Sequence, residues 1–210
     1  PGLALALEPS DIRSAVREKK MGHHIFFVVD ASGSMGSKGR MAAAKGAVIS
    51  LLLDAYQKRD QVALISFRRQ EAVLNLPLTA SVDLAGRLLA EMPVGGRTPL
   101  AQGLALAHRE VMNVLAKNQL ARPIVIIITD GRGNVSSGGN SQAHPLREAW
   151  ALAGIMARDK RVRYLVVDTE ETSQLSFELA AKLAQALEAA YFRIQELESQ
   201  TLLDLVRKEA

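Results

Sequence analysis

The chain has 210 residues, of which 48% are hydrophobic, and it contains no cysteine. A chain of this length can bury one substantial core. The lack of cysteine excludes disulfides, thiolate metal sites and cysteine nucleophiles, and is typical of a reducing compartment. The formal net charge is only +4 and aromatic residues make up 4%. This composition argues against a nucleic-acid-binding domain, which usually has a concentrated basic stripe with exposed aromatic side chains.

The beginning of the chain does not look like a targeting segment. Residues 3–7 are apolar, but they are too few for a signal peptide and no basic segment precedes them. Every uninterrupted apolar run falls far short of the roughly 20 residues that cross a bilayer. We expect no transmembrane segment and a cytoplasmic location, or the chloroplast stroma in a plastid-bearing organism. Because the chain begins Pro-Gly rather than Met, we expect a domain excised from a longer protein.

Short apolar runs rich in β-branched residues alternate with longer segments of helical periodicity. In chain order, the expected strands are residues 25–29, 62–67, 72–76, 124–128, 162–167 and 191–194. The third of these is expected to be a short edge strand that Pro77 stops. The expected helices are residues 41–55, 100–116, 145–157, 179–189 and 201–208. This alternation predicts an α/β fold with a doubly wound, mostly parallel central sheet flanked by helices.

The most informative motif is Asp30-Ala31-Ser32-Gly33-Ser34, directly after the first expected strand. One carboxylate and two hydroxyls at alternate positions form a compact set of hard oxygen donors. Such a set suits Mg²⁺ or Mn²⁺ better than zinc. Asp130 follows another expected strand, and doubly wound sheets bind their ligands at the carboxyl ends of strands. We therefore expect Asp30 and Asp130 at the same edge of the sheet.

The glycine-rich segment Gly95-Gly96-Arg97-Thr98-Pro99-Leu100 supplies a third element. Thr98 is either a helix N-cap, followed by proline at the first helical position, or a loop hydroxyl that reaches the ion. Asp-Ala-Ser-Gly-Ser alone is also compatible with an ordinary strand-to-helix turn, because Ser and Asp favour caps. The combination with Thr98 and Asp130 favours a Mg²⁺ site. Few direct protein ligands would leave a position open for an outside carboxylate.

Two enzyme motifs are incomplete in this region. Ser34-Met35-Gly36 lacks the first glycine of a nucleophile elbow, because Ser32 occupies that position. Residues 33–40 are rich in glycine but lack the Gly-Lys-Ser/Thr ending of a phosphate-binding loop. We therefore expect no bound nucleotide and no serine hydrolysis. A metal-assisted hydrolase would also need a general base near the ion, and the sequence offers no convincing one.

Several basic residues fall near the expected metal edge. They belong either to a solvated surface or to a cationic collar that steers an acidic partner toward the ion. These residues are Lys38, Arg40, Arg68, Arg69, Arg97 and Arg132.

Longer segments of the chain resemble the C-terminal von Willebrand A (integrin I-like) domain of the magnesium chelatase D subunit and of related cobalt chelatase subunits. The matching segments are residues 27–35, 40–48, 51–60, 62–68, 95–101 and 166–170. The likeness spans about residues 11–208, and we expect a lead-in over residues 1–20 and the domain over residues 21–210. The resemblance implies a metal-ion-dependent adhesion site whose ligands are Asp30, Ser32, Ser34, Thr98 and Asp130.

The resemblance also implies a function. The family inserts Mg²⁺ into protoporphyrin IX with ATP, a step of chlorophyll biosynthesis in photosynthesis. Its D subunit couples an AAA+ I-type subunit to the large porphyrin-binding H-type subunit. The domain would then be a metal-dependent interaction module whose ion is completed by an acidic partner carboxylate. That ion differs from the one inserted into the porphyrin, so we expect the isolated chain to have neither chelatase nor ATPase activity.

Alternatives and one departure from the family pattern remain. The alternative within the same class is a cobalt chelatase subunit or a stand-alone AAA+-associated von Willebrand A protein. An extracellular adhesion domain shares the ion chemistry but fits poorly with the lack of disulfides. Arg97 replaces the third glycine that the family loop often carries. A bulky cation there adds positive charge beside the ion and narrows the conformations of the loop.

Overall fold

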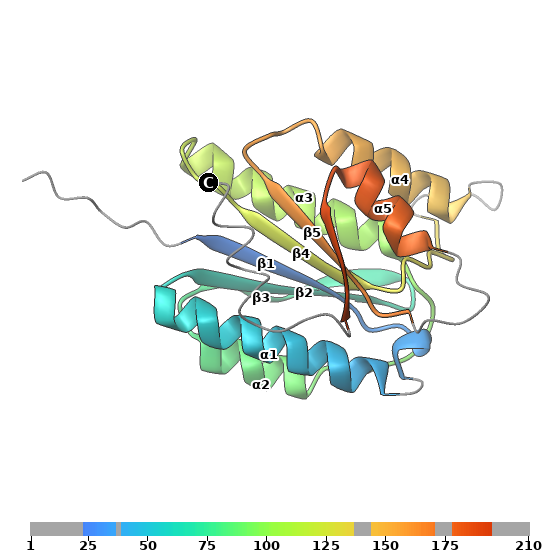
Figure 1. The fold of residues 1–210 in the computed structure, drawn as a ribbon, viewed down its shortest axis with the longest axis horizontal. Coiled ribbons are helices and arrows are strands. Elements are labelled where there is room, and N and C mark those ends of the chain that lie inside the picture. The colour runs from blue at the N-terminus through green and yellow to red at the C-terminus, as the bar shows by residue number, and fades with distance from the viewer. Residues whose placement is uncertain (1–22, 37–38, 137–143, 171–177, 195–210) are drawn as a thin grey trace, which may run out of the picture.

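A central sheet organises the molecule (Figure 1). The computed structural model describes residues 23–36, 39–136, 144–170 and 178–194. The strands in these ranges are β1 His24–Asp30, β2 Gln61–Arg68, β3 Glu71–Thr79, β4 Ile124–Thr129, β5 Arg163–Asp168 and β6 Ala190–Arg193. Their spatial order is β3-β2-β1-β4-β5-β6. Only the β2–β3 pair is antiparallel among these strands, which confirms the predicted mostly parallel sheet.

Helices cover both faces of the sheet (Figure 1). They are α1 Arg40–Lys58, α2 Val82–Ala90, α3 Leu100–Lys117, α4 Pro145–Met156 and α5 Leu179–Leu187, with a short 3-10 helix at Gly33–Gly36. Alternate residues of β1 supply the two cores. Phe27 packs with the apolar stripes of α1 and α2, whereas Phe26 packs with those of α3, α4 and α5. Burial on both faces explains why the parallel strands have continuous apolar sequences.

Two features at the β3 edge differ from the prediction. The strand does not stop at Pro77 but continues to Thr79. Because β3 lies at the edge of the sheet, a proline that lacks an N–H can point its nitrogen away from the ladder. The helix α2, which follows β3, is absent from the predicted elements. It has only nine residues and contains Gly86 in its middle, which weakens the helical signal.

The other elements agree with the prediction to within a few residues at their ends. The expected terminal helix at residues 201–208 lies outside the described residues. Within the described ranges, none of the helices combines the length and the hydropathy needed to cross a bilayer.

The strand order places a topological switch point between β1 and β4. The chain leaves β1 toward β2 on one side, and it returns through α3 to β4 on the other side. The segments that follow β1 and β4 therefore leave the sheet side by side at the carboxyl ends of these strands, the place where doubly wound folds bind their ligands. Asp30 ends β1, and Asp130 directly follows β4.

Candidate metal centre

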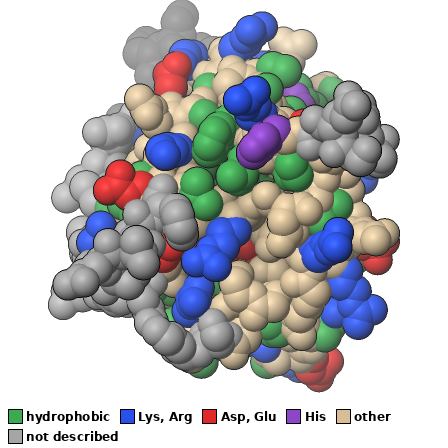
Figure 2. All heavy atoms as spheres, turned by 90° about the vertical axis from the view of Figure 1, so that its right-hand side faces the viewer, with side chains coloured by type: hydrophobic (Ala, Val, Ile, Leu, Met, Phe, Trp, Pro, Cys, Tyr) green, Lys and Arg blue, Asp and Glu red, His purple; other side chains and the backbone are tan. Residues whose placement is uncertain are grey.

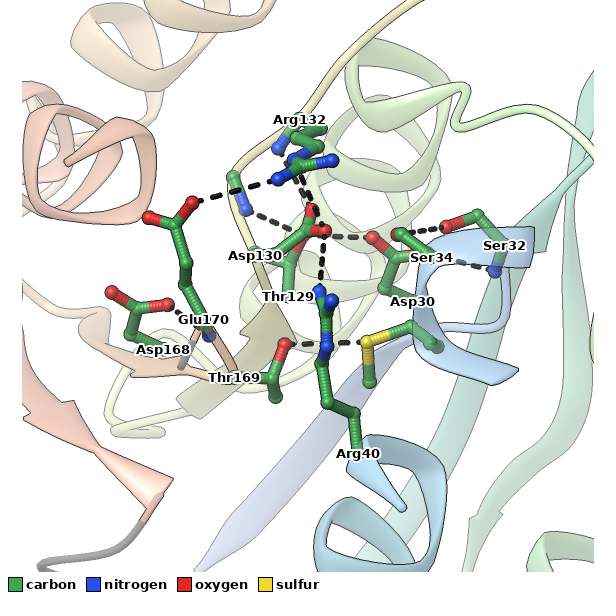
Figure 3. A network of polar contacts seen from close by, with 12 residues as sticks. Asp30, Ser32, Ser34, Arg40, Thr129, Asp130, Arg132, Asp168, Thr169 and Glu170 are labelled. Carbon is green, nitrogen blue, oxygen red and sulfur yellow. Dashed lines mark hydrogen bonds and ion pairs between the residues drawn. The ribbon is translucent and has the colours of Figure 1, made fainter. Parts of the chain in front are cut away.

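The loop after β1 holds three oxygen donors close together (Figure 3). The Ser32 N–H donates to Asp30 Oδ1 at 2.8 Å, and the Ser32 and Ser34 Oγ atoms lie 3.0 Å apart. Asp30 and Ser32 are fully buried. The 3-10 turn at Gly33–Gly36 bends the chain back so that both serines stay beside the strand end. The motif is thus folded into a compact donor set rather than extended into solvent.

The end of β4 contacts this set of oxygen donors through Thr129, the last residue of the strand. Its hydroxyl donates to Asp30 Oδ2 at 2.9 Å and accepts the Gly131 N–H at 3.0 Å. This buried contact links the ends of two neighbouring strands and fixes the Asp30 carboxylate. It also sets the position of Asp130, which lies between Thr129 and Gly131 and is 1% exposed. Sequence reasoning missed Thr129, although a threonine in an otherwise aliphatic strand next to Asp130 was an available signal.

The third loop carries Thr98 and is tied to both of the others by backbone hydrogen bonds. The Gly33 N–H donates to the Gly96 carbonyl at 2.9 Å. The Thr98 N–H donates to Asn134 Oδ1 at 2.7 Å, and the Asn134 N–H donates back to the Thr98 carbonyl at 3.1 Å. Asn134 is a further positioning residue that the sequence did not reveal. The structure therefore brings all three predicted segments to one edge of the sheet, while the role of Thr98 as a metal ligand stays a prediction.

The loop around Thr98 shows that this residue does not have one of the two roles that the sequence left open, that of helix N-cap. Helix α3 begins at Leu100 with Pro99 as its N-cap, and Thr98 makes no capping bond. Gly95 and Gly96 have φ of 137° and 94°, whereas Arg97 is not among the described residues with positive φ. Only the first two positions therefore need glycine, and Arg97 fits without backbone strain. A side chain at Gly96 would also meet Arg69, because a Cβ there would lie 2.6 Å from Arg69 Cγ.

The electrostatics of this edge suit a divalent cation. Burial, and after it the neighbouring charge of Asp130, raise the pKa of Asp30 to about 7, against the hydrogen bonds from Ser32 and Thr129 that lower it. Two buried carboxylates that repel each other are stabilised by a cation between them. Among the described residues, no three His, Cys, Asp or Glu side chains cluster as metal ligands. A cation here would therefore rely on hydroxyls and water as well, which Mg²⁺ tolerates.

We predict that the metal-free domain loses stability relative to an Asp30→Asn variant as the pH rises from about 4 to about 7. In this window the folded state keeps the Asp30 proton and the unfolded state does not, because the folded pKa is about 7 and the unfolded value is near 3.9. Thermal unfolding in EDTA at pH 5 and pH 8 measures the effect. The comparison between variants is needed because burial lowers the pKa of His24, and a lowered histidine pKa makes the stability of the domain rise with pH instead of fall. A difference that does not change with pH would contradict the prediction.

The proposed collar residues divide into two groups. Arg40 Nη1 and Arg132 Nε each lie 3.5 Å from Asp130 Oδ2 (Figure 3). By contrast, Arg68, Arg69 and Arg97 make no hydrogen bond or ion pair with the candidate ligands in the described part of the chain, and Lys38 lies outside the described residues. Figure 2 shows Lys and Arg side chains spread over the face at the carboxyl ends of the strands. The surface is basic around the site, and among the described arginines Arg40 and Arg132 are the two that contact Asp130.

Comparison with known proteins decides the family. A model described as the von Willebrand factor type A domain matches residues 25–132, which include β1, the glycine loop and Asp130. The chain belongs to the von Willebrand factor type A domain family. This von Willebrand A domain has the strand order and the topological switch point described above. BatB from Bacteroides thetaiotaomicron has a solved structure that is similar, with a TM-score of 0.68, 19% identity and coverage of 89% of this chain and 98% of that one. This likeness shows the fold alone.

Sequence relatives extend over nearly the whole von Willebrand A domain. An uncharacterized protein of Mycobacterium tuberculosis is 44% identical over 95% of this chain and 30% of its own length. The magnesium-chelatase 67 kDa subunit of Heliobacterium mobile is 39% identical over 94% of this chain and 30% of its own length. An uncharacterized protein of Methanocaldococcus jannaschii is 36% identical over 82% of this chain and 97% of its own length. The resemblance to magnesium-chelatase subunits is confirmed, although the domain spans only about a third of those proteins.

Proposed function

We propose that this domain is a divalent-cation-dependent docking module of a chelatase-type assembly. Asp30, Ser32, Ser34, Thr98 and Asp130 would hold Mg²⁺ or Mn²⁺. The observation that carries the proposal is the meeting of three loops at the switch point, with two buried carboxylates and paired serine hydroxyls at one edge. The bound ion would supply a Lewis-acid position that a carboxylate from outside completes.

The similarity to magnesium-chelatase subunits supports the kind of assembly to which we assign this module. In that setting the partners are an AAA+ I-type subunit and the large porphyrin-binding H-type subunit, and the assembly inserts Mg²⁺ into protoporphyrin IX; a cobalt chelatase would insert its own metal. The domain contributes docking rather than insertion, since its donors are buried hydroxyls and carboxylates instead of a slot for a macrocycle. A second candidate is a stand-alone domain that serves an AAA+ protein. The Methanocaldococcus relative favours it, because the chain spans 97% of that protein.

The test is binding of the 210-residue chain to a purified I-type AAA+ subunit, measured by calorimetry in Mg²⁺ and in EDTA. We expect binding in Mg²⁺, loss of binding in EDTA, and a decrease of roughly tenfold in affinity for Thr98→Val, which removes one proposed oxygen ligand. Thr169→Val is the matched control. Thr169 is also buried at this edge, but its hydroxyl faces Met35 Sδ at 3.2 Å. An affinity for the AAA+ subunit that changes neither in EDTA nor in the Thr98→Val variant would contradict the proposal.

A further inference from the structure

The Asp130 carboxylate has two arginine neighbours that come from different elements (Figure 3). Arg40 is the first residue of α1, and its Nη1 lies 3.5 Å from Asp130 Oδ2. Arg132 follows two residues after Asp130, and its Nε lies 3.5 Å from the same oxygen. Two guanidinium groups therefore face one carboxylate oxygen that the proposed function assigns to a divalent cation.

Both contacts are long for an ion pair with hydrogen bonds, in which N···O distances are usually about 2.7–2.9 Å. The same molecule offers a tight pair for comparison. Arg161 donates from Nε at 2.9 Å and from Nη2 at 2.6 Å to the two carboxylate oxygens of Asp159. The arginines at Asp130 are thus held mainly by charge. They can leave this oxygen with little loss of hydrogen bonding.

The environment of Arg40 indicates that an acceptor is missing. Its side chain is only 14% exposed, and its buried Nε has no hydrogen-bond partner within the described structure. Buried donors without acceptors are costly and rare in folded proteins. A carboxylate arriving at this edge would supply the acceptor, since guanidinium groups bind carboxylates through two parallel hydrogen bonds.

Arg132 has a second anchor that keeps it at the rim. Its Nη2 lies 3.6 Å from Glu170 Oε1, and its side chain is 46% exposed. Glu170 follows β5, so Arg132 bridges the carboxyl ends of β4 and β5. This anchor would hold the guanidinium near the carboxyl ends of these two strands after its contact with Asp130 is lost.

We propose that Arg40 and Arg132 form a metal-controlled receptor for a carboxylate of the partner, an inference that rests on the metal site of the proposed function. Without metal, the two arginines neutralise Asp130. A divalent cation bound by Asp130 takes over that role and repels both guanidinium groups. Their donors then turn to the carboxylate that completes the ion's coordination. Metal and carboxylate bind cooperatively, and each strengthens the other by the same factor. The partner segment therefore presents an Asp or Glu side chain.

This receptor has a consequence that a purely structural role lacks. Removing either arginine relieves the repulsion of the cation and removes a competitor for Asp130, so metal alone binds more tightly. The same substitution removes a donor to the carboxylate, so the carboxylate binds more weakly to the metal-loaded domain. Replacement of a residue that only supports the fold would instead weaken the binding of both the metal and the carboxylate.

The experiment uses the 210-residue chain with Mn²⁺ and acetate as probes. Electron paramagnetic resonance of free Mn²⁺ gives the metal affinity, and relaxation of the acetate methyl protons by bound Mn²⁺ gives the carboxylate affinity. Arg40→Gln and Arg132→Gln should each bind Mn²⁺ alone about fivefold more tightly and acetate about fivefold more weakly, the lower end of typical coupling factors. Arg40→Lys should keep the wild-type Mn²⁺ affinity and still lose acetate, because lysine retains the charge without the fork.

Arg161→Gln is the matched control. It removes one positive charge and breaks an arginine–aspartate pair just before β5, at the amino end of that strand and therefore away from the metal site. It should change neither affinity. The wild type could bind Mn²⁺ while the Gln variants at positions 40 and 132 leave both affinities unchanged or weaken both. That result would contradict the proposed role of the two arginines and leave the proposed metal site intact. A wild type that binds no Mn²⁺ overturns the receptor and the proposed function together.

Discussion

Replacement of Asp30 by asparagine is expected to abolish Mg²⁺ binding and the stabilisation that Mg²⁺ gives to the domain. Asparagine keeps the size of the side chain and an acceptor for the Ser32 N–H, but it removes the charge that a reluctantly dehydrating Mg²⁺ requires. At a Mg²⁺ concentration 100 times the dissociation constant, the wild type should gain about 2.7 kcal/mol in free energy of unfolding. In a domain of this size, this corresponds to an increase of roughly 5–10 °C in the unfolding midpoint.

Calorimetric unfolding in Mg²⁺ and in EDTA measures this difference. Asp54→Asn is the matched control, because Asp54 pairs with Lys58 at 3.0 Å on the outer side of α1 and should leave the Mg²⁺ response intact. In EDTA above pH 7, Asp30→Asn should be at least as stable as the wild type, since it removes a buried charge beside Asp130. A variant at Asp30 that is still stabilised by Mg²⁺ would show that Asp30 is not a ligand.

Gly131→Ala is expected to destabilise the domain by about 2–5 kcal/mol, a large share of the 5–15 kcal/mol that holds a typical domain folded. Gly131 has φ of 74°, in the left-handed region that a side chain disfavours. A Cβ at this position would lie 2.2 Å from the Ala180 nitrogen and 2.4 Å from the Leu179 carbonyl carbon. These atoms are backbone at the start of α5, so they cannot move aside as a flexible side chain would.

Urea unfolding of the metal-free chain measures the cost of Gly131→Ala. Gly154→Ala is the control with the opposite sign. Gly154 lies inside α4, and a Cβ there would meet nothing within 4 Å, so alanine should stabilise the helix by roughly 0.5–1 kcal/mol. The Gly131 N–H donates to the Thr129 hydroxyl, which in turn donates to Asp30, so the backbone shift that alanine forces here should weaken Mg²⁺ binding as well. Equal stability of the two variants would contradict the packing at the start of α5.

The elements buried on both faces of the sheet could be predicted from the sequence. Strands such as β1 and β4 are short runs of consecutive apolar residues, and such runs need cover on two sides whatever their neighbours are. The edge of the sheet was less predictable. Strand β3 passes through Pro77 and α2 contains Gly86, and both are tolerated because the surrounding packing outweighs their local preferences.

The sequence by itself determined the donor chemistry of the candidate site and the edge at which it would lie. Asp30, Ser32 and Ser34 are close in the chain, and a doubly wound fold places strand ends such as that before Asp130 together. Their assignment as ligands stays a prediction.

Only the tertiary structure decided which other side chains control those donors. Thr129 meets Asp30 across 99 positions of the sequence, and Arg40 meets Asp130 across 90. Contacts over such separations depend on the order and register of the strands. Local periodicity carries no record of them, so the sequence does not distinguish Arg40 and Arg132 from the arginines that make no contact with Asp130; the pairing of β1 with β4 decides it.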